Sequence, residues 1–194
     1  MGLVGKLDVT QSVGPMKIYG FIYILLVCCV SLAVAHPVPD ISVFSTFDKE
    51  TVTIEVIIDP RSFTDDPEGE PYMHKSELGF KDEAKKQKLK DKGQDLIDRT
   101  VVFKFSPGET LKPVFSFDFI GLDKTELKQD TDPVMLIGLA TVEIPDGTTS
   151  YQVIADESGE LSVIFRNMLK GEEVDRYMVL FPGESSFELD ITQR

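Results

Sequence analysis

The chain has 194 residues, and its 33 acidic side chains outnumber 20 basic ones, giving a formal net charge of −13. This acidity excludes a general role in binding nucleic acid, which needs a basic surface against phosphates. It also argues against attachment to anionic lipid surfaces. Beyond these exclusions, the acidity bears on solubility and mutual repulsion and does not indicate a specific partner.

An apolar segment near the N-terminus, Ile18–Leu32, follows Lys17 and precedes Ala33-Val34-Ala35. A positive residue, an apolar run and a small-residue site in that order predict a signal peptide over residues 16–35, cleaved after its last residue. The alternative is an uncleaved N-terminal membrane anchor, because a spanning helix needs about 20 apolar residues. Cleavage is favoured because of the small-residue site.

Cleavage there defines the rest of the organisation. Residues 1–15 precede Met16 as a mis-start or an extended n-region, and residues 36–194 form a single secreted domain beginning at His36. Both cysteines of the chain lie within the signal segment. The mature domain would then have no disulfide, no Cys-ligated zinc and no thiol catalysis, and would be held together by burial alone.

Alternating apolar and polar residues, rich in β-branched types, predict strands along most of the mature chain. The first two, Ile41–Phe47 and Thr51–Ile58, are separated by Asp48-Lys49-Glu50, which predicts an antiparallel hairpin. Further strands are predicted over 101–105, 114–120, 134–144, 151–155, 161–165, 177–181 and 187–191.

One window, about residues 76–99, has the Lys, Glu, Gln, Leu and Ala composition of a helix. Its few apolar positions, including Leu89, Leu96 and Ile97, form a narrow stripe, so we expect the helix to lie on the outside of the domain, and Gly93 to fray or divide it. Strands that do not alternate with helices predict a mainly β fold. We expect an antiparallel, immunoglobulin-like β-sandwich with this one helical insertion.

Two histidines are the candidate metal ligands. Cleavage would give His36 a free α-amine beside its imidazole, a pair of nitrogens suited to copper, and His74 is the only other histidine. Secreted β-sandwich copper proteins, such as lytic polysaccharide monooxygenases and periplasmic copper carriers, use an N-terminal histidine in this way. The opposing interpretation is that both histidines are ordinary surface residues.

The loop 59–70 is rich in acid, proline and glycine and offers hard oxygen ligands for calcium. Its spacing does not match an EF-hand, so a solvated loop is the favoured interpretation. The carboxylates concerned are Asp59, Asp65, Asp66, Glu68 and Glu70.

Catalytic patterns are not found in the sequence. Ser185 and Ser186 lack the Gly-x-Ser-x-Gly elbow. Two histidines leave little room for a Ser-His-Asp set, and glycine-rich phosphate loops are missing. These observations predict a protein that is not an enzyme.

Two stretches, AHPVPD at Ala35–Asp40 and LFPGESSFELDI at Leu180–Ile191, resemble the secreted N-terminal β-rich regions of bacterial HupE/UreJ-type membrane proteins. In that group the β-rich region precedes several membrane helices and is associated with metal-related transport or assembly. No such bundle follows here before Arg194. The resemblance implies an exported module that works beside a membrane partner.

We therefore expect a non-enzymatic accessory or interaction module of the bacterial cell envelope, periplasmic or secreted, whose partner is a membrane or envelope protein. The competing expectation is a copper-binding protein that uses His36 and His74. The two expectations differ in a measurable property, which is stoichiometric copper on the processed chain.

Overall fold

The computed structural model describes residues 40–79, 82–174, 176 and 178–193. Residues 1–15, the predicted signal peptide and His36 lie outside the described residues. Within them the elements are β1 Ile41–Phe47, β2 Thr51–Ile58, η1 Pro60–Phe63, η2 Lys75–Leu78, α2 Glu83–Thr100, β3 Val101–Ser106, β4 Glu109–Leu111, β5 Ser116–Ile120, η3 Leu122–Lys124, β6 Met135–Glu143, β7 Ser150–Ala155, β8 Val163–Leu169, β9 Glu172–Glu173, β10 Met178–Leu180 and β11 Leu189–Asp190.

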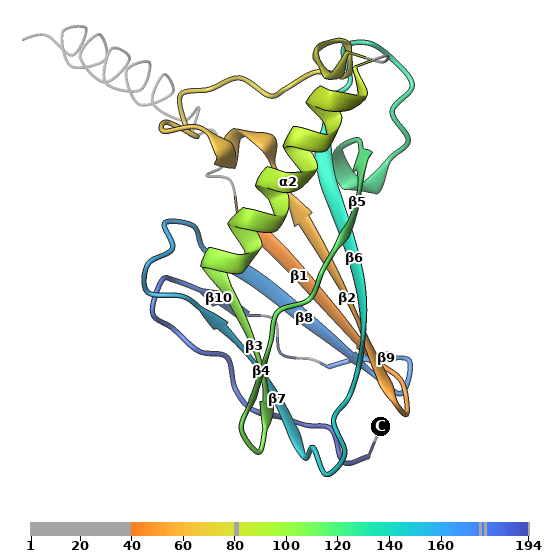
Figure 1. Cartoon of the computed structure of the whole chain (residues 1–194), viewed down its shortest axis with the longest axis vertical. Coiled ribbons are helices and arrows are strands. Elements are labelled where there is room, and N and C mark those ends of the chain that lie inside the picture. The colour runs from red at the N-terminus through yellow and green to blue at the C-terminus, as the bar shows by residue number, and fades with distance from the viewer. Residues whose placement is uncertain (1–39, 80–81, 175, 177, 194) are drawn as a thin grey trace, which may run out of the picture. The chain divides into compact units, whose positions relative to one another are not determined.

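The larger of two sheets has the strand order β10-β8-β1-β2-β6-β5, with β9 paired to the end of β8 (Figure 1). The predicted hairpin of β1 and β2 is confirmed, with Ile41 opposite Ile58. All neighbours in this sheet run antiparallel except β1 and β8, which are parallel, with Ile41 opposite Val163. An antiparallel sandwich was predicted, and this parallel pair is the exception.

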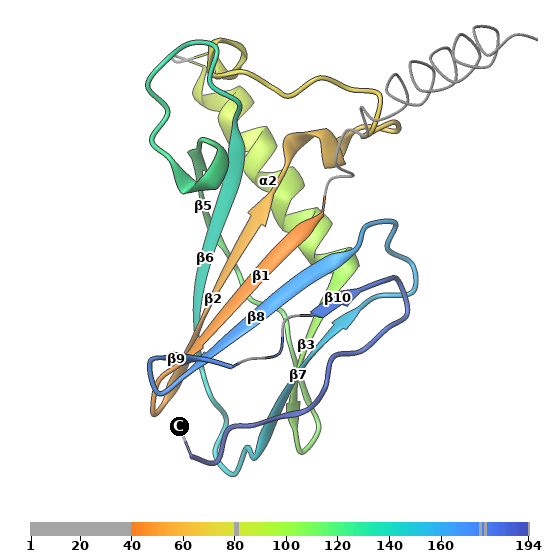
Figure 2. The same ribbon diagram turned by 180° about the vertical axis from the view of Figure 1, so that it is seen from behind.

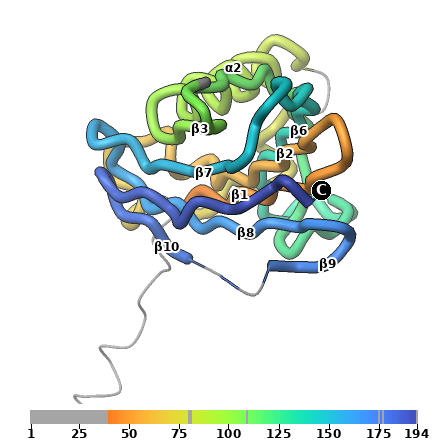
Figure 3. The backbone as a smooth tube through the Cα atoms, turned by 90° about the horizontal axis from the view of Figure 1, so that it is seen from below, coloured from red at the N-terminus to blue at the C-terminus, as the bar shows by residue number. Residues whose placement is uncertain are grey.

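The smaller sheet has the order β11-β7-β3-β4 and stacks on part of one face of the larger sheet (Figure 3). Inward side chains of both sheets meet in one apolar core, because successive residues of a strand point to opposite faces. The mainly β, two-sheet sandwich is confirmed, with one α-helix among the described residues. The largest fully buried side chains include Tyr151, Phe103, Phe105 and Phe165.

Helix α2 covers a part of the same face that the small sheet leaves open, and it leads directly into β3 (Figure 1). The predicted stripe of Leu89, Leu96 and Ile97 is buried. The helix begins later than predicted because the chain first forms η2 and then turns at Gly79, which has a φ of 60°. Asp82 caps α2 by accepting a hydrogen bond from the Lys85 amide at 3.0 Å.

Gly93 neither frays nor divides α2, contrary to expectation. It is buried within the helix, and a Cβ at this position would lie 3.0 Å from Cδ2 of Leu136. On the sheet below, a Cβ on Gly138 would lie 2.5 Å from the Phe117 ring. The two glycines therefore let the helix and the Phe117 ring pack closely on β6.

Among the helices of the described residues, none has the length and apolar content needed to cross a membrane.

Candidate functional site

His74 is half-buried at the start of η2, where it joins two loops. Its Nδ1 lies 2.8 Å from the Thr131 carbonyl oxygen, and its backbone N–H donates to Oε1 of Glu77 at 2.9 Å. Because a carbonyl only accepts, Nδ1 is the donor, and in the neutral imidazole Nε2 then has the lone pair. This arrangement is the usual one for a histidine that binds a metal through Nε2.

His36 lies outside the described residues, so the predicted pairing of His36 with His74 stays a prediction. In the part of the chain that the structure describes, no group of three or more His, Cys, Asp or Glu side chains is placed to hold a metal ion.

The acidic loop after β2 has four exposed carboxylates, as the favoured interpretation of a solvated loop predicts, but its first carboxylate is sequestered. Asp59 is 3% exposed and caps η1, accepting a hydrogen bond from the Arg61 amide at 2.9 Å. Its Oδ2 also accepts from Nε and Nη2 of Arg61 at 2.8 and 2.7 Å. The other carboxylates of the loop, from Asp65 to Glu70, are exposed.

Arg61 is as buried as its partner, at 4% exposed, and stacks over the Tyr72 ring with 3.8 Å between Cζ and the ring centroid. The hydrogen bond to Asp59 raises the pKa of the guanidinium above its ordinary value, against the opposing effect of burial. The pair is thus a permanently charged, neutralised cluster at the end of β2.

Three buried side-chain atoms among the described residues have no hydrogen-bond partner, and two of them belong to η1. They are Nη1 of Arg61, Oγ of Ser62 and Oδ1 of Asn167. A buried polar atom without a partner is costly and uncommon in folded proteins. The turn η1 therefore combines a hydrogen-bonded ion pair with two buried polar atoms that have no hydrogen-bond partner.

A second candidate surface is the outer face of the large sheet, which is turned away from the small sheet and α2 (Figure 2). On a solvated sheet face, the outward residues are normally polar. Here the strand register aligns a nearly continuous apolar row across five strands, which we call the outer row. From β10 to β6 it consists of Val179, Ile164, Ser42, Ile57 and Ile137.

Large apolar side chains beside the outer row are still more exposed. Leu139, two residues from Ile137 on β6, is 48% exposed, and Phe181, directly after β10, is 60% exposed. On the neighbouring register row, Phe44 lies under Lys124, with 4.4 Å from Nζ to the ring centroid. Lys124 in turn pairs with Glu55 at 2.6 Å. The face therefore combines an apolar centre with a charged margin.

Sequence reasoning missed both features, although signals for each were present. Asp59, Pro60 and Arg61 directly follow the buried strand β2. An aspartate that caps the turn after a strand can also form an ion pair with an arginine of the same turn. Adjacent apolar residues such as Ile57 and Ile58 break the alternation and indicate apolar side chains on both faces.

Comparison of the sequence with protein-family models and with curated proteins gives no match. The resemblance to HupE/UreJ-type regions therefore stays a prediction, and the functional argument depends on the geometry alone.

Proposed function

We propose that this chain is an exported, non-enzymatic interaction module of the bacterial cell envelope, periplasmic or secreted, that docks on a separate envelope protein. The observation that supports the proposal is the outer row with its neighbours Leu139 and Phe181, an apolar surface on the face away from the core. Contiguous exposed apolar surface is typical of protein interaction sites.

The charge of the chain favours a different protein over a second copy as the occupant. Two copies, each with a net charge of −13, repel one another when they approach. A membrane or envelope protein with a complementary apolar face and a less acidic surface meets no such repulsion. The margin around Phe44, where Lys124 pairs with Glu55, then lies at the rim of the interface.

A photo-crosslinking side chain introduced at Leu139 in the producing cells tests the proposal. We expect one discrete crosslinked envelope protein, which is lost when Ile137→Glu is added. The matched control places the same crosslinker at Lys88, an exposed position on α2, on the other side of the large sheet. Equal products from both positions, a crosslinked dimer of this chain, or no product would each contradict the proposal.

A second candidate function, copper binding by His36 and His74, is supported by the orientation of His74. The Thr131 carbonyl oxygen lies 2.8 Å from Nδ1 and accepts its hydrogen, so in the neutral ring the Nε2 lone pair is available to a ligand. Its premise is that cleavage after Ala35 exposes the His36 amine.

Equilibrium dialysis of the processed chain against Cu²⁺ tests this candidate. We expect one bound ion per chain, lost in His36→Ala and weakened at least about tenfold in His74→Asn. Asparagine is chosen because its amide can keep the bond to the Thr131 carbonyl, so the loop stays in place. Copper binding that is unchanged in both variants, or a mature N-terminus other than His36, would exclude this function.

A further inference from the structure

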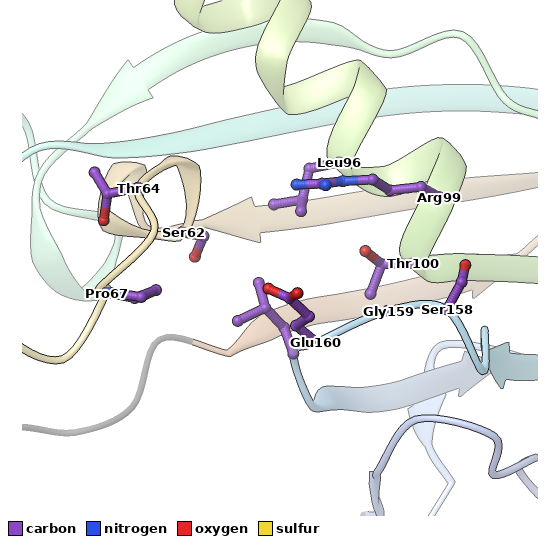
Figure 4. A pocket seen from close by; sticks show the side chains of 10 residues that line it. Ser62, Thr64, Pro67, Leu96, Arg99, Thr100, Ser158, Gly159 and Glu160 are labelled. Carbon is purple, nitrogen blue, oxygen red and sulfur yellow. The ribbon is translucent and has the colours of Figure 1, made fainter.

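A small cavity of about 60 Å³ lies where η1, the last turn of α2 and the loop between β7 and β8 meet (Figure 4). Apolar side chains, Leu96 and Leu161, form part of its wall. Its polar lining comes from three separate segments of the chain, and the residues that matter here are Ser62, Arg99 and Glu160. None of its lining residues belongs to the outer row, so a ligand here would bind independently of the proposed docking partner.

Ser62 supplies a hydroxyl that has no partner. The side chain is 94% buried, and Oγ makes no hydrogen bond in the structure. The residue is held in place because its backbone N–H donates to the Asp59 carbonyl at 2.9 Å within η1. A rigid turn thus positions a buried, unsatisfied hydroxyl at the wall of the cavity, where a bound molecule would satisfy it.

Arg99 and Glu160 supply opposite charges at the same cavity. Arg99 extends from α2 toward Ser62, and the carboxylate of Glu160 comes from the loop on the opposite side (Figure 4). Within the described residues, neither side chain forms an ion pair or a hydrogen bond with another group, and they do not bond to each other. Both residues are exposed, so the cavity opens between a cation and an anion at its rim, and this combination matches a molecule that carries both charges itself.

The volume limits the size of that molecule. At about 15 Å³ for each water-sized group, 60 Å³ accommodates on the order of four groups, comparable to the smallest amino acid. Leu96 and Leu161 leave little space for a longer side chain. Free anions such as acetate would satisfy Arg99 but place a second negative charge near Glu160.

We propose that this cavity binds a small α-amino acid as its zwitterion. The ligand carboxylate accepts hydrogen bonds from the Arg99 guanidinium and the Ser62 hydroxyl, and the ligand ammonium group donates to the Glu160 carboxylate. The three contacts come from α2, η1 and the β7–β8 loop. The ligand therefore links three segments that line the same cavity.

Titration of the ¹⁵N-labelled processed chain with glycine tests the proposal by NMR. We expect saturable shifts of the Ser62, Ser158 and Gly159 amides, which lie at the cavity. Acetate and methylamine, which each carry one of the two charges, should bind at least about tenfold more weakly than glycine. No saturable shift with glycine, or equal affinity for acetate and glycine, would overturn the proposal.

Variants assign the contacts. Arg99→Gln and Glu160→Gln should each weaken glycine binding by about tenfold or more, since each removes a charge-assisted hydrogen bond. Lys92→Gln and Glu157→Gln, exposed positions on the same two segments, are the matched controls and should bind glycine as the unmodified chain does.

Ser62→Ala should weaken glycine binding without lowering the melting temperature, because its hydroxyl has no partner in the free protein. Binding unaffected by Glu160→Gln would overturn the zwitterion assignment.

Discussion

Two buried polar clusters of this protein differ in how completely their polar atoms are hydrogen-bonded. Between the sheets, Ser45 and Tyr151 are 0% and 1% exposed, and their hydroxyls are bonded to each other at 2.9 Å. At the end of β2, Asp59 and Arg61 are bonded to each other, but Nη1 of Arg61 and Oγ of Ser62 have no partner. One cluster meets its hydrogen-bonding needs within the pair, and the other leaves two atoms unmet.

The positions of the clusters explain the difference. Tyr151 packs edge-on against Phe47, with 5.0 Å between ring centroids, so its hydroxyl has only Ser45 to bond. Ser62 and Arg61 instead line cavities that open beside η1. Two of the three unmet polar atoms of the described residues therefore belong to residues that line a cavity, as is typical of binding sites, and the third, Oδ1 of Asn167, lies in β8.

Breaking the ion pair at η1 should have the largest effect on stability. Asp59→Asn leaves the guanidinium of Arg61 buried without a counter-charge, and we expect a loss of about 3–5 kcal/mol in the free energy of unfolding. Urea denaturation measures it. The matched control is Asp65→Asn, an exposed carboxylate of the same loop, which should change stability by less than about 0.5 kcal/mol. Similar losses in the two variants would show that the ion pair is not the cause.

Removing the hydroxyl of Tyr151 should have a smaller effect. Tyr151→Phe leaves Oγ of Ser45 buried and unpaired, which costs about 1–3 kcal/mol. The double variant Ser45→Ala with Tyr151→Phe removes both partners and should recover part of that loss. A double variant that is less stable than the sum of both single changes would contradict the pairing.

Alkaline pH should also act through Tyr151. Burial raises the pKa of its hydroxyl well above the ordinary value, so the folded chain keeps a proton that the unfolded chain loses above about pH 10. Stability is therefore full below pH 10 and falls by about 1.4 kcal/mol for each pH unit above it. Chemical denaturation from pH 9 to 11 measures the slope. Tyr151→Phe should flatten it by that amount.

The unpaired hydroxyl at η1 should give the smallest effect, and of opposite sign. Ser62→Ala removes a buried oxygen that makes no hydrogen bond, so we expect unchanged stability or a gain of up to about 1 kcal/mol. Thermal unfolding measures the difference. A loss above about 1 kcal/mol would mean that Oγ has a partner in solution, and the contrast between the two clusters would fail.

Local patterns in the sequence predicted the local parts of the fold. The alternation in Thr51–Ile58 and the polar turn before it predicted the first hairpin correctly. The start of α2 was misplaced because helix-forming composition extends back to η2, and only the left-handed turn at Gly79 separates the two. The parallel pairing of β1 with β8 joins segments over a hundred residues apart, which no local pattern encodes.

The site was less predictable for a related reason. His74 was identified by residue type alone, and its bond to the Thr131 carbonyl depends on two loops meeting in space. Asp59 was grouped with the exposed acids of its loop, although its burial follows from Arg61 folding back over it. Charge in a sequence indicates solvent exposure on average, and only tertiary packing identifies the exceptions.

The parallel pairing of β1 with β8 also constrains when this protein can fold. β1 is the first described strand, and one of its two neighbours is not available until residues 163–169 have been synthesised. Closing so long a loop is slow, because its entropy must be lost before the contacts form. A chain that emerges from the ribosome N-terminus first therefore stays incompletely folded for most of its synthesis.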